Sequence, residues 1–225
     1  MKIGGIQKIS MIDYPGKMSC VLFTSGCNFK CPYCHNPELI HTKKELNLEE
    51  IFLFLKTRID FIEGIVISGG EPTLHTDLLQ FCKKIKKMGF KIKLDTNGSN
   101  PNMIGHVIDF VDYIAMDIKT LPKNYKRLWI NAKYKNILNS INLIKKYAKD
   151  YEFRTTIVKP FITFDNIEKI GEIIENANLY ALQKYKIEKV LNKKFFENKN
   201  RSFTDYEIQN LKLKISFYVK NVVVR

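Results

Sequence analysis

The chain has 225 residues, of which 45% are hydrophobic and 27% are charged. This length and composition are typical of one globular domain that buries its own core without disulfides or a structural metal. The sequence contains neither a secretory signal nor an apolar stretch long enough to cross a bilayer, so we expect a cytoplasmic protein without a membrane partner.

Lysine and arginine outnumber aspartate and glutamate by 37 to 23, which gives a net charge of +14. Such an excess is compatible with an acidic partner, for example nucleic acid, a nucleotide or an acidic protein surface. The lysines are spread along the chain, however, and are densest in residues 182–201. We interpret most of them as solvated surface, so nucleic acid is not the partner that we expect.

Six apolar, β-branched segments alternate with longer amphipathic segments along the chain. The expected strands are residues 19–25, 64–69, 90–96, 111–119, 151–158 and 179–185. The expected helices are residues 47–59, with Asn47 and Glu50 resembling a capping box, and residues 76–89, 100–110, 134–150 and 165–177. This alternation predicts an α/β fold with a parallel sheet, either barrel-like or doubly wound.

We expect the whole chain, residues 1–225, to form one domain. Residues 1–18 are predicted to form a small hairpin-like appendage, and residues 19–185 hold the six βα units. Residues 186–225 are a basic extension that ends in a helix and a short apolar strand. Each of the six strands leads into glycine, polar or charged residues, and in barrel-like α/β folds these strand ends carry the chemistry.

Three of the five cysteines, Cys27, Cys31 and Cys34, follow the first of these strands with the spacing C-x3-C-x2-C. Clustered thiolates select zinc, copper(I) or iron–sulfur clusters. A structural zinc site needs four ligands, and His35, which abuts Cys34, is badly placed to be the fourth. Three ligands to a four-iron cluster instead leave one iron open to a substrate or cofactor. The pattern therefore favours a catalytic cluster.

The remaining two cysteines, Cys20 and Cys82, lie within a strand-like and a helix-like segment, and we interpret them as buried thiols. An odd number of cysteines also argues against a secreted disulfide framework.

The segment "GCNFKCPYC", followed after the next strand by "SGGEP", resembles the radical S-adenosylmethionine (SAM) superfamily. The longer segment "ISMIDYPGKMSCVLFTSGCNFKCPYCHNPEL" is similar to the anaerobic ribonucleoside-triphosphate reductase activating proteins, a group of glycyl-radical-enzyme activases. The close similarity covers about residues 3–40, and the weaker one extends to about residue 185. The resemblance implies a partial (β/α)6 barrel of the TIM type.

The resemblance also implies that Cys27, Cys31 and Cys34 hold a 4Fe-4S cluster whose fourth iron is chelated by the methionine moiety of SAM. An electron from the cluster would then cleave SAM into methionine and a 5'-deoxyadenosyl radical. This chemistry belongs to the cofactors, and the protein positions them and excludes water.

Four further residues are expected beside SAM. Gly69 and Gly70 would let the backbone approach a ligand closely. Glu71 would place a carboxylate near the amino group of SAM, or it would be a turn residue whose carboxylate is hydrogen-bonded within the protein. Tyr33 resembles the aromatic residue of the family that meets the adenine.

The later strand ends supply charged and amide candidates. By resemblance, Asp95 and Asn97 lie beside SAM, and Asp95 together with Asp117 would bind a monovalent cation, for which oxygen ligands are suited. Lys119 and Arg154 could neutralise the carboxylate of SAM or could form ordinary ion pairs. His35 and Asn36 match the activase signature without an assignable role.

The leading hypothesis is an activase that abstracts a glycine Cα hydrogen from a glycyl radical enzyme. The expected partner is anaerobic ribonucleotide reductase, and the expected electron donor is flavodoxin or ferredoxin. One alternative is a radical SAM enzyme on a small molecule, such as 7-carboxy-7-deazaguanine synthase. A second alternative is a zinc-bound basic nucleic-acid-binding module.

We expect His41, His75 and His106 to be structural or surface residues.

Overall fold

A computed structural model describes residues 1–41, 45–185, 190–197 and 200–225. Part of the basic segment 182–201 therefore lies outside the described residues. The strands are β1 (Ile3–Ser10), β2 (Ser19–Thr24), β3 (Gly64–Gly69), β4 (Lys91–Thr96), β5 (Tyr113–Asp117), β6 (Tyr151–Ile157), β7 (Tyr180–Lys184) and β8 (Val222–Val224). The α-helices are α1 (Leu48–Lys56), α2 (Leu78–Lys87), α3 (Pro101–Val107), α4 (Tyr134–Tyr147), α5 (Phe164–Ile173), α6 (Lys193–Phe196) and α7 (Asp205–Ser216).

All eight strands form one sheet in the order β1-β2-β3-β4-β5-β6-β7-β8. Strands β2 to β8 pair in parallel, and β1 pairs antiparallel with β2. Because neighbours in the sheet are also neighbours in sequence, the sheet winds in one direction, as in an incomplete barrel. The predicted parallel α/β fold is confirmed, and β8 adds a seventh parallel strand to the predicted six.

The N-terminal segment belongs to the same sheet. Its strand β1 reaches the start of β2 through the turn at residues 11–18 and pairs with that strand along most of its length. Ser10 lies opposite Ser19, and Ile3 lies opposite Thr24. The hairpin therefore consists of residues 1–18 together with β2, and it extends the sheet beyond the first βα unit.

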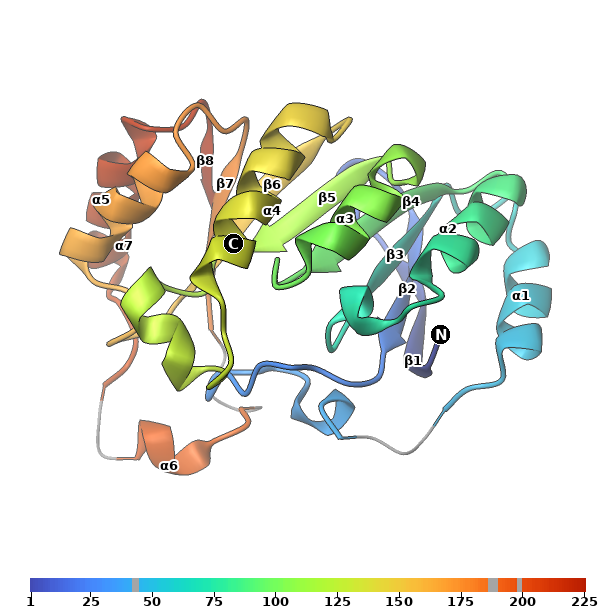
Figure 1. The fold of residues 1–225 in the computed structure, drawn as a ribbon, viewed down its shortest axis with the longest axis horizontal. Coiled ribbons are helices and arrows are strands. Elements are labelled where there is room, and N and C mark those ends of the chain that lie inside the picture. The colour runs from blue at the N-terminus through green and yellow to red at the C-terminus, as the bar shows by residue number, and fades with distance from the viewer. Residues whose placement is uncertain (42–44, 186–189, 198–199) are drawn as a thin grey trace.

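Helices cover the outer face of the curved sheet, while the loops that follow the strands gather at one edge (Figure 1). Helix α2 illustrates why these segments are helical, because Leu78, Phe81, Cys82 and Ile85 recur at helical spacing and are buried. The predicted capping box at Asn47 and Glu50 is wrong in detail, since Asn47 caps α1 through the backbone N–H of Glu49. In the described residues no helix is long and apolar enough to span a membrane.

Two apolar clusters lie on opposite faces of the sheet. The large one lies between the sheet and its helices and contains Leu94, Ile114 and Phe153, each 0–1% exposed. The small one lies on the inner face of the curved sheet and consists of Tyr14, Val21, Val66, Tyr113 and Ala115. Toward the C-terminal ends of the strands, the inner face changes from apolar to charged, and the candidate site lies there.

Candidate active site

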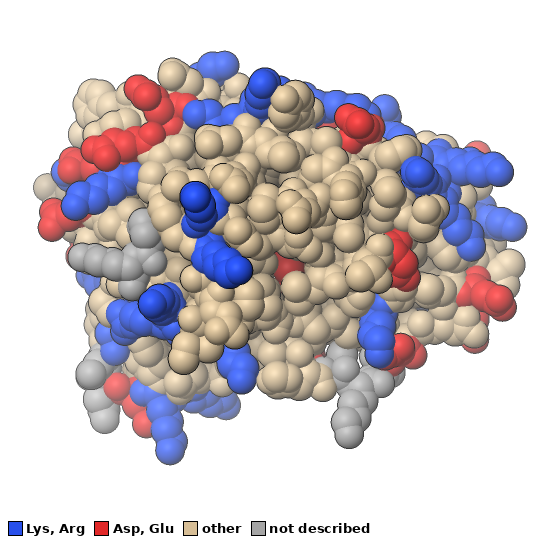
Figure 2. All heavy atoms as spheres, viewed as in Figure 1, with Lys and Arg blue, Asp and Glu red and all other residues tan. Residues whose placement is uncertain are grey.

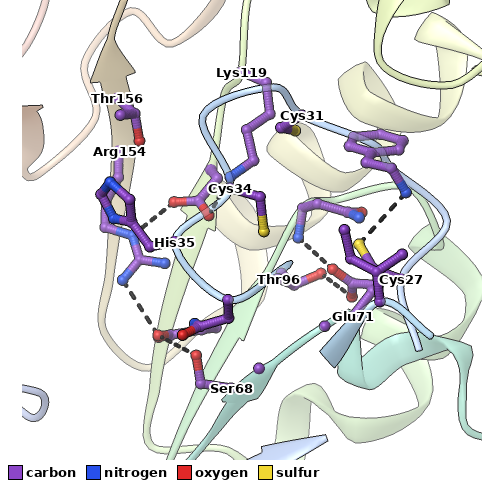
Figure 3. A pocket seen from close by; sticks show the side chains of 18 of the residues that line it. Cys27, Cys31, Cys34, His35, Ser68, Glu71, Thr96, Lys119, Arg154 and Thr156 are labelled. Carbon is purple, nitrogen blue, oxygen red and sulfur yellow. Dashed lines mark hydrogen bonds and ion pairs between the residues drawn. The ribbon is translucent and has the colours of Figure 1, made fainter. Parts of the chain in front are cut away.

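All residues predicted for the site line one pocket of about 320 Å³ at the C-terminal ends of the strands. They are Cys27, Cys31, Tyr33, Cys34, Gly69, Gly70, Glu71, Asp95, Asn97, Asp117, Lys119 and Arg154. His35 and Asn36 line the same pocket. In Figure 3 the cysteines frame one part of the pocket, and Arg154, Thr156 and His35 lie across from Cys27.

The cysteine loop leaves β2 through a tight turn at Gly26, whose φ of 91° lies in the left-handed region that favours glycine. The Gly26 N–H donates to the Leu39 carbonyl at 2.7 Å, so the loop closes on itself. The Gly26 carbonyl accepts from the Glu71 N–H at 2.8 Å, which fixes the loop to the end of β3. The local sequence thus holds the three cysteines on a compact, anchored loop.

Among the three cysteines of the loop, Cys31 is buried, and Cys27 and Cys34 are partly buried. Burial raises the pKa of Cys31 to about 11, and burial together with the negative charge of Glu71 raises the pKa of Cys27 to about 12. These thiols are protonated at neutral pH until a bound metal displaces the proton. Soft sulfur donors of this kind fit an iron–sulfur cluster.

In the described ranges, no group of three or more His, Cys, Asp or Glu side chains is placed to hold a metal ion. Cysteines that ligate a 4Fe-4S cluster each bind a different iron atom, so their sulfur atoms need not converge on one point. Three sulfur donors around one pocket are therefore compatible with a group that contains several metal atoms.

Gly69 and Gly70 contact the cysteine loop, and their expected approach to a ligand stays a prediction. A Cβ atom at Gly70 would lie 2.0 Å from the Gly26 carbonyl oxygen, and one at Gly69 would lie 2.4 Å from the Thr24 nitrogen. Gly69 also has a φ of 110°, which L side chains rarely adopt. The two glycines let the end of β3 pack directly against the backbone of the cysteine loop.

The hydrogen bonds of Glu71 agree with the turn role that we considered from the sequence, and its expected role near the amino group of SAM stays a prediction. It is 1% exposed, and its two oxygens accept hydrogen bonds from Thr73, the Thr96 hydroxyl and the Asn97 N–H, the last at 2.6 Å. Burial raises its pKa, and these hydrogen bonds oppose that shift. Glu71 therefore braces the ends of β3 and β4 against each other.

Asn97 connects the β4 end to the cysteine loop. Its side-chain N–H donates to Asn28 at 2.9 Å, and its side-chain oxygen accepts from the Ser99 N–H at 2.9 Å. The Asn28 side chain also donates to the Ser99 hydroxyl. Asn28 was not among the predicted site residues, although its position between Cys27 and Cys31 was a signal that it helps to hold the loop.

Arg154 and Lys119 form ion pairs with the aspartates of the neighbouring strand ends. The Arg154 Nε donates to Asp117 at 2.8 Å, its Nη1 lies 3.3 Å from Asp95, and the Lys119 Nζ lies 2.8 Å from Asp117. Burial opposes ionisation of Asp117, yet the charges of Arg154 and Lys119 hold its pKa well below the usual range. The two aspartates that were predicted to bind a cation therefore have positively charged partners within the protein.

Tyr33 is 3% exposed, and its ring packs edge-on against Phe161 with the ring centroids 5.5 Å apart. Its hydroxyl donates to the Lys119 carbonyl at 3.4 Å. Its role toward adenine stays a prediction.

The predicted structural role of His75 agrees with its contact of 3.0 Å with the Ser25 carbonyl.

A family model described as the radical SAM superfamily matches residues 21–177. The chain belongs to this superfamily. It is a radical SAM enzyme, and its cofactors are accordingly a 4Fe-4S cluster and SAM. This membership favours the iron–sulfur interpretation of the cysteines over the zinc-bound module.

Similar proteins show to which group within the radical SAM superfamily the chain is related. The chain is 37% identical over 99% of its length to a protein of Methanocaldococcus jannaschii with the provisional name glycyl-radical enzyme activating enzyme, and it covers 95% of that protein. It is 27% identical to the pyruvate formate-lyase-activating enzyme of Clostridium pasteurianum, with 78% of this chain and 76% of that protein covered. These relatives place the radical SAM chain among the glycyl-radical-enzyme activating enzymes.

A solved structure supports the fold alone. The crystal structure of Streptococcus suis SuiB matches 91% of this chain and 48% of that chain, with a TM-score of 0.69 and 13% sequence identity. At this identity the similarity concerns the partial barrel and not the substrate.

Proposed function

We propose that this radical SAM enzyme activates anaerobic ribonucleotide reductase by abstracting a glycine Cα hydrogen from it, with Cys27, Cys31 and Cys34 as the cluster ligands. The observation that carries the proposal is the arrangement of three thiols and the cationic side chains of Lys119 and Arg154 around one pocket. The activating-enzyme relatives support the general role, and the similarity of residues 9–39 to reductase activases supports the partner.

The side chains of the pocket have separable roles in this proposal. When bound, the cluster and SAM supply the reductive cleavage that produces the adenosyl radical. Lys93, Lys119 and Arg154 carry three positive charges, and Asp95 and Asp117 carry two negative ones, so this buried network has one surplus positive charge. That surplus suits the carboxylate of the methionine moiety of SAM.

A second cavity offers a route for the partner. It measures about 860 Å³ and shares Asp13, His35, Arg154, Thr156 and Gln183 with the first pocket. A cavity that is continuous with the site could admit a glycine-bearing loop from another protein. On the face drawn in Figure 2, basic side chains are scattered and interspersed with acidic ones, which favours a protein partner over nucleic acid.

The first test is the formation of 5'-deoxyadenosine by anaerobically reconstituted protein with dithionite and SAM, measured by chromatography. We expect activity in the wild type and a loss of at least about 100-fold in Cys34→Ala. Cys82→Ala, which changes a buried cysteine of helix α2, is the matched control and should keep activity. Iron-loaded wild type that forms no 5'-deoxyadenosine would contradict the proposal.

The second test identifies the partner by electron paramagnetic resonance, with flavodoxin or ferredoxin as the reductant. A glycyl radical signal after mixing with anaerobic ribonucleotide reductase is the expected result. A signal only with pyruvate formate-lyase would keep the activase role and replace the partner. Formation of 5'-deoxyadenosine without a glycyl radical in either enzyme would overturn the proposed partner and favour a test of a small-molecule substrate, such as the pterin-like one of 7-carboxy-7-deazaguanine synthase.

A further inference from the structure

Lys93 is a buried lysine on the inner face of the sheet. It lies two residues before Asp95 on β4, and residues at this spacing on a strand share a face. The Lys93 side chain is 3% exposed, and its Nζ lies 2.5 Å from the Asp95 Oδ1. A lysine is rarely buried to this degree unless it is paired, so the position of Lys93 is tied to that carboxylate.

The aspartates of the network have no carboxylate oxygen without a protein donor. At Asp95, Oδ1 faces Lys93, and Oδ2 accepts from the Ser68 hydroxyl at 3.0 Å and faces Arg154. At Asp117, Oδ1 accepts from Arg154 and Oδ2 accepts from Lys119. The two carboxylates that were expected to bind a monovalent cation already have positive partners.

A monovalent cation at this place would add a fourth positive charge beside two negative ones. The side chains of the network are 3–19% exposed, so solvent screens the repulsion only weakly. Lys119 and Arg154 line the first pocket, whereas Lys93 lines only the neighbouring cavity. Lys93 is therefore the cation of the network that supports Asp95 from outside the pocket.

We propose that the Lys93 ammonium permanently supplies the single positive charge that a monovalent cation would otherwise bring to Asp95 and Asp117, so that SAM binding needs no sodium or potassium ion. This inference rests on the proposed use of the pocket for SAM, and it does not depend on the identity of the glycyl radical enzyme.

The test measures SAM affinity by equilibrium dialysis with the iron-loaded enzyme at constant ionic strength in potassium, sodium or choline chloride. Wild type should bind SAM with the same affinity, within about twofold, in all three salts. Lys93→Ala should bind SAM about tenfold more weakly in choline chloride and should recover in potassium or sodium chloride, an effect within the usual range of coupling between two ligands. Methylammonium, which restores an ammonium group, should also rescue this variant.

Lys91→Ala is the matched control, because Lys91 lies on the same strand and is exposed at its other end, where it faces Asp112. It should behave as the wild type does in every salt. Lys93→Thr, which strands accommodate well and which also leaves the place of the ammonium group open, replaces Lys93→Ala if the latter does not fold.

Three outcomes would overturn the inference. Wild type that binds SAM fivefold or more tightly in potassium or sodium than in choline chloride needs a cation in spite of Lys93. If neither alkali ions nor methylammonium restores the SAM affinity of a Lys93 variant, no cation can take the place of the lost ammonium group. A Lys91→Ala response equal to that of Lys93→Ala would make the effect nonspecific.

If wild type binds no SAM in any salt, the proposed function fails, and melting temperatures then test Lys93 separately. Potassium chloride should raise the melting temperature of Lys93→Ala relative to choline chloride by more than it raises that of the wild type. Equal increases would overturn the inference.

Discussion

The two faces of the sheet differ in what they bury. The outer face buries apolar side chains such as Leu94 and Phe153 against the helices, while the inner face holds the partly buried charged side chains of Asp95 and Arg154. Phe153 and Arg154 are consecutive residues of β6, so the alternation of a strand directs one to each face. The same strands thus provide a stable scaffold on one side and charged groups for a ligand on the other.

The apolar outer face and the charged inner face contribute differently to the stability of the fold. Apolar burial stabilises a fold by about 25 cal/mol per Å². A buried ion pair contributes little net stability, because desolvation offsets the attraction, although removal of one partner is costly. We therefore expect substitutions on the outer face to act on folding, and substitutions on the inner face to act on SAM binding as well.

The largest effect on stability is expected for Phe153→Ala. Phe153 is 0% exposed in the large apolar cluster, so its truncation should lower the free energy of unfolding by about 4 kcal/mol through lost burial and a cavity. Urea denaturation measures this change. The fraction that remains folded should bind SAM with nearly wild-type affinity. A loss below about 1 kcal/mol would contradict the assignment of the outer face as the main source of stability.

Arg154→Met tests the other face of the same strand. It leaves Asp95 and Asp117 without their shared partner, so we expect a loss of about 3 kcal/mol in the free energy of unfolding. SAM affinity should also fall by at least about tenfold, because a cation of the pocket is removed. Arg127→Met, which changes an exposed arginine, is the control and should alter stability by less than about 1 kcal/mol. Unchanged SAM affinity in Arg154→Met would separate Arg154 from ligand binding.

Gly70→Ala tests the contact between β3 and the cysteine loop. A Cβ atom at Gly70 would lie 2.0 Å from the Gly26 carbonyl oxygen, so the loop must shift. We expect a loss of about 2 kcal/mol in stability, as for other overpacking substitutions, and a lower iron content after reconstitution.

Gly105→Ala is the matched control, because a Cβ atom there would make an ordinary contact of 3.6 Å with Leu143. It should be neutral or slightly stabilising in helix α3. Full iron loading in Gly70→Ala would contradict the role of this contact.

The sequence predicted the fold well because strand and helix periods are local properties. All six predicted strands are present with bounds that differ by at most two residues, and the residues chosen at their ends share one pocket. The cysteine spacing likewise identified the loop. These features depend on neighbours in sequence and on the rule that parallel strands end at the same edge.

The partners of individual side chains could not be predicted in the same way. Glu71 accepts hydrogen bonds from Thr96 and Asn97. These contacts depend on how β3 and β4 are placed side by side, which the sequence does not show. The surroundings of Asp95 include groups from β3, β4 and β6, and a single sequence does not reveal such tertiary neighbours. The spacing of Lys93 and Asp95 was a local signal that could have been used, because it places both residues on one face of a strand.

The smallest expected effect concerns Asp112, at the opposite end of the sheet from the site. Burial would raise the pKa of Asp112, but hydrogen bonds from Lys86 and the Ile92 N–H, both at 2.9 Å, lower it below the usual value. A carboxylate with a lowered pKa in the folded state stabilises the protein above its unfolded pKa, and that stability is lost as the pH falls through the folded pKa.

Urea denaturation between about pH 7 and pH 3 should therefore show a loss of stability toward acid that is smaller in Asp112→Asn. The difference at neutral pH should be only about 0.5–1 kcal/mol, because Lys86 and Lys91 are 28% and 54% exposed and solvent screens the pair. Equal pH profiles for the two proteins would mean that the ion pairs between Asp112 and its more exposed lysines contribute nothing to stability, in contrast to the network around Arg154, whose cations are 3–16% exposed.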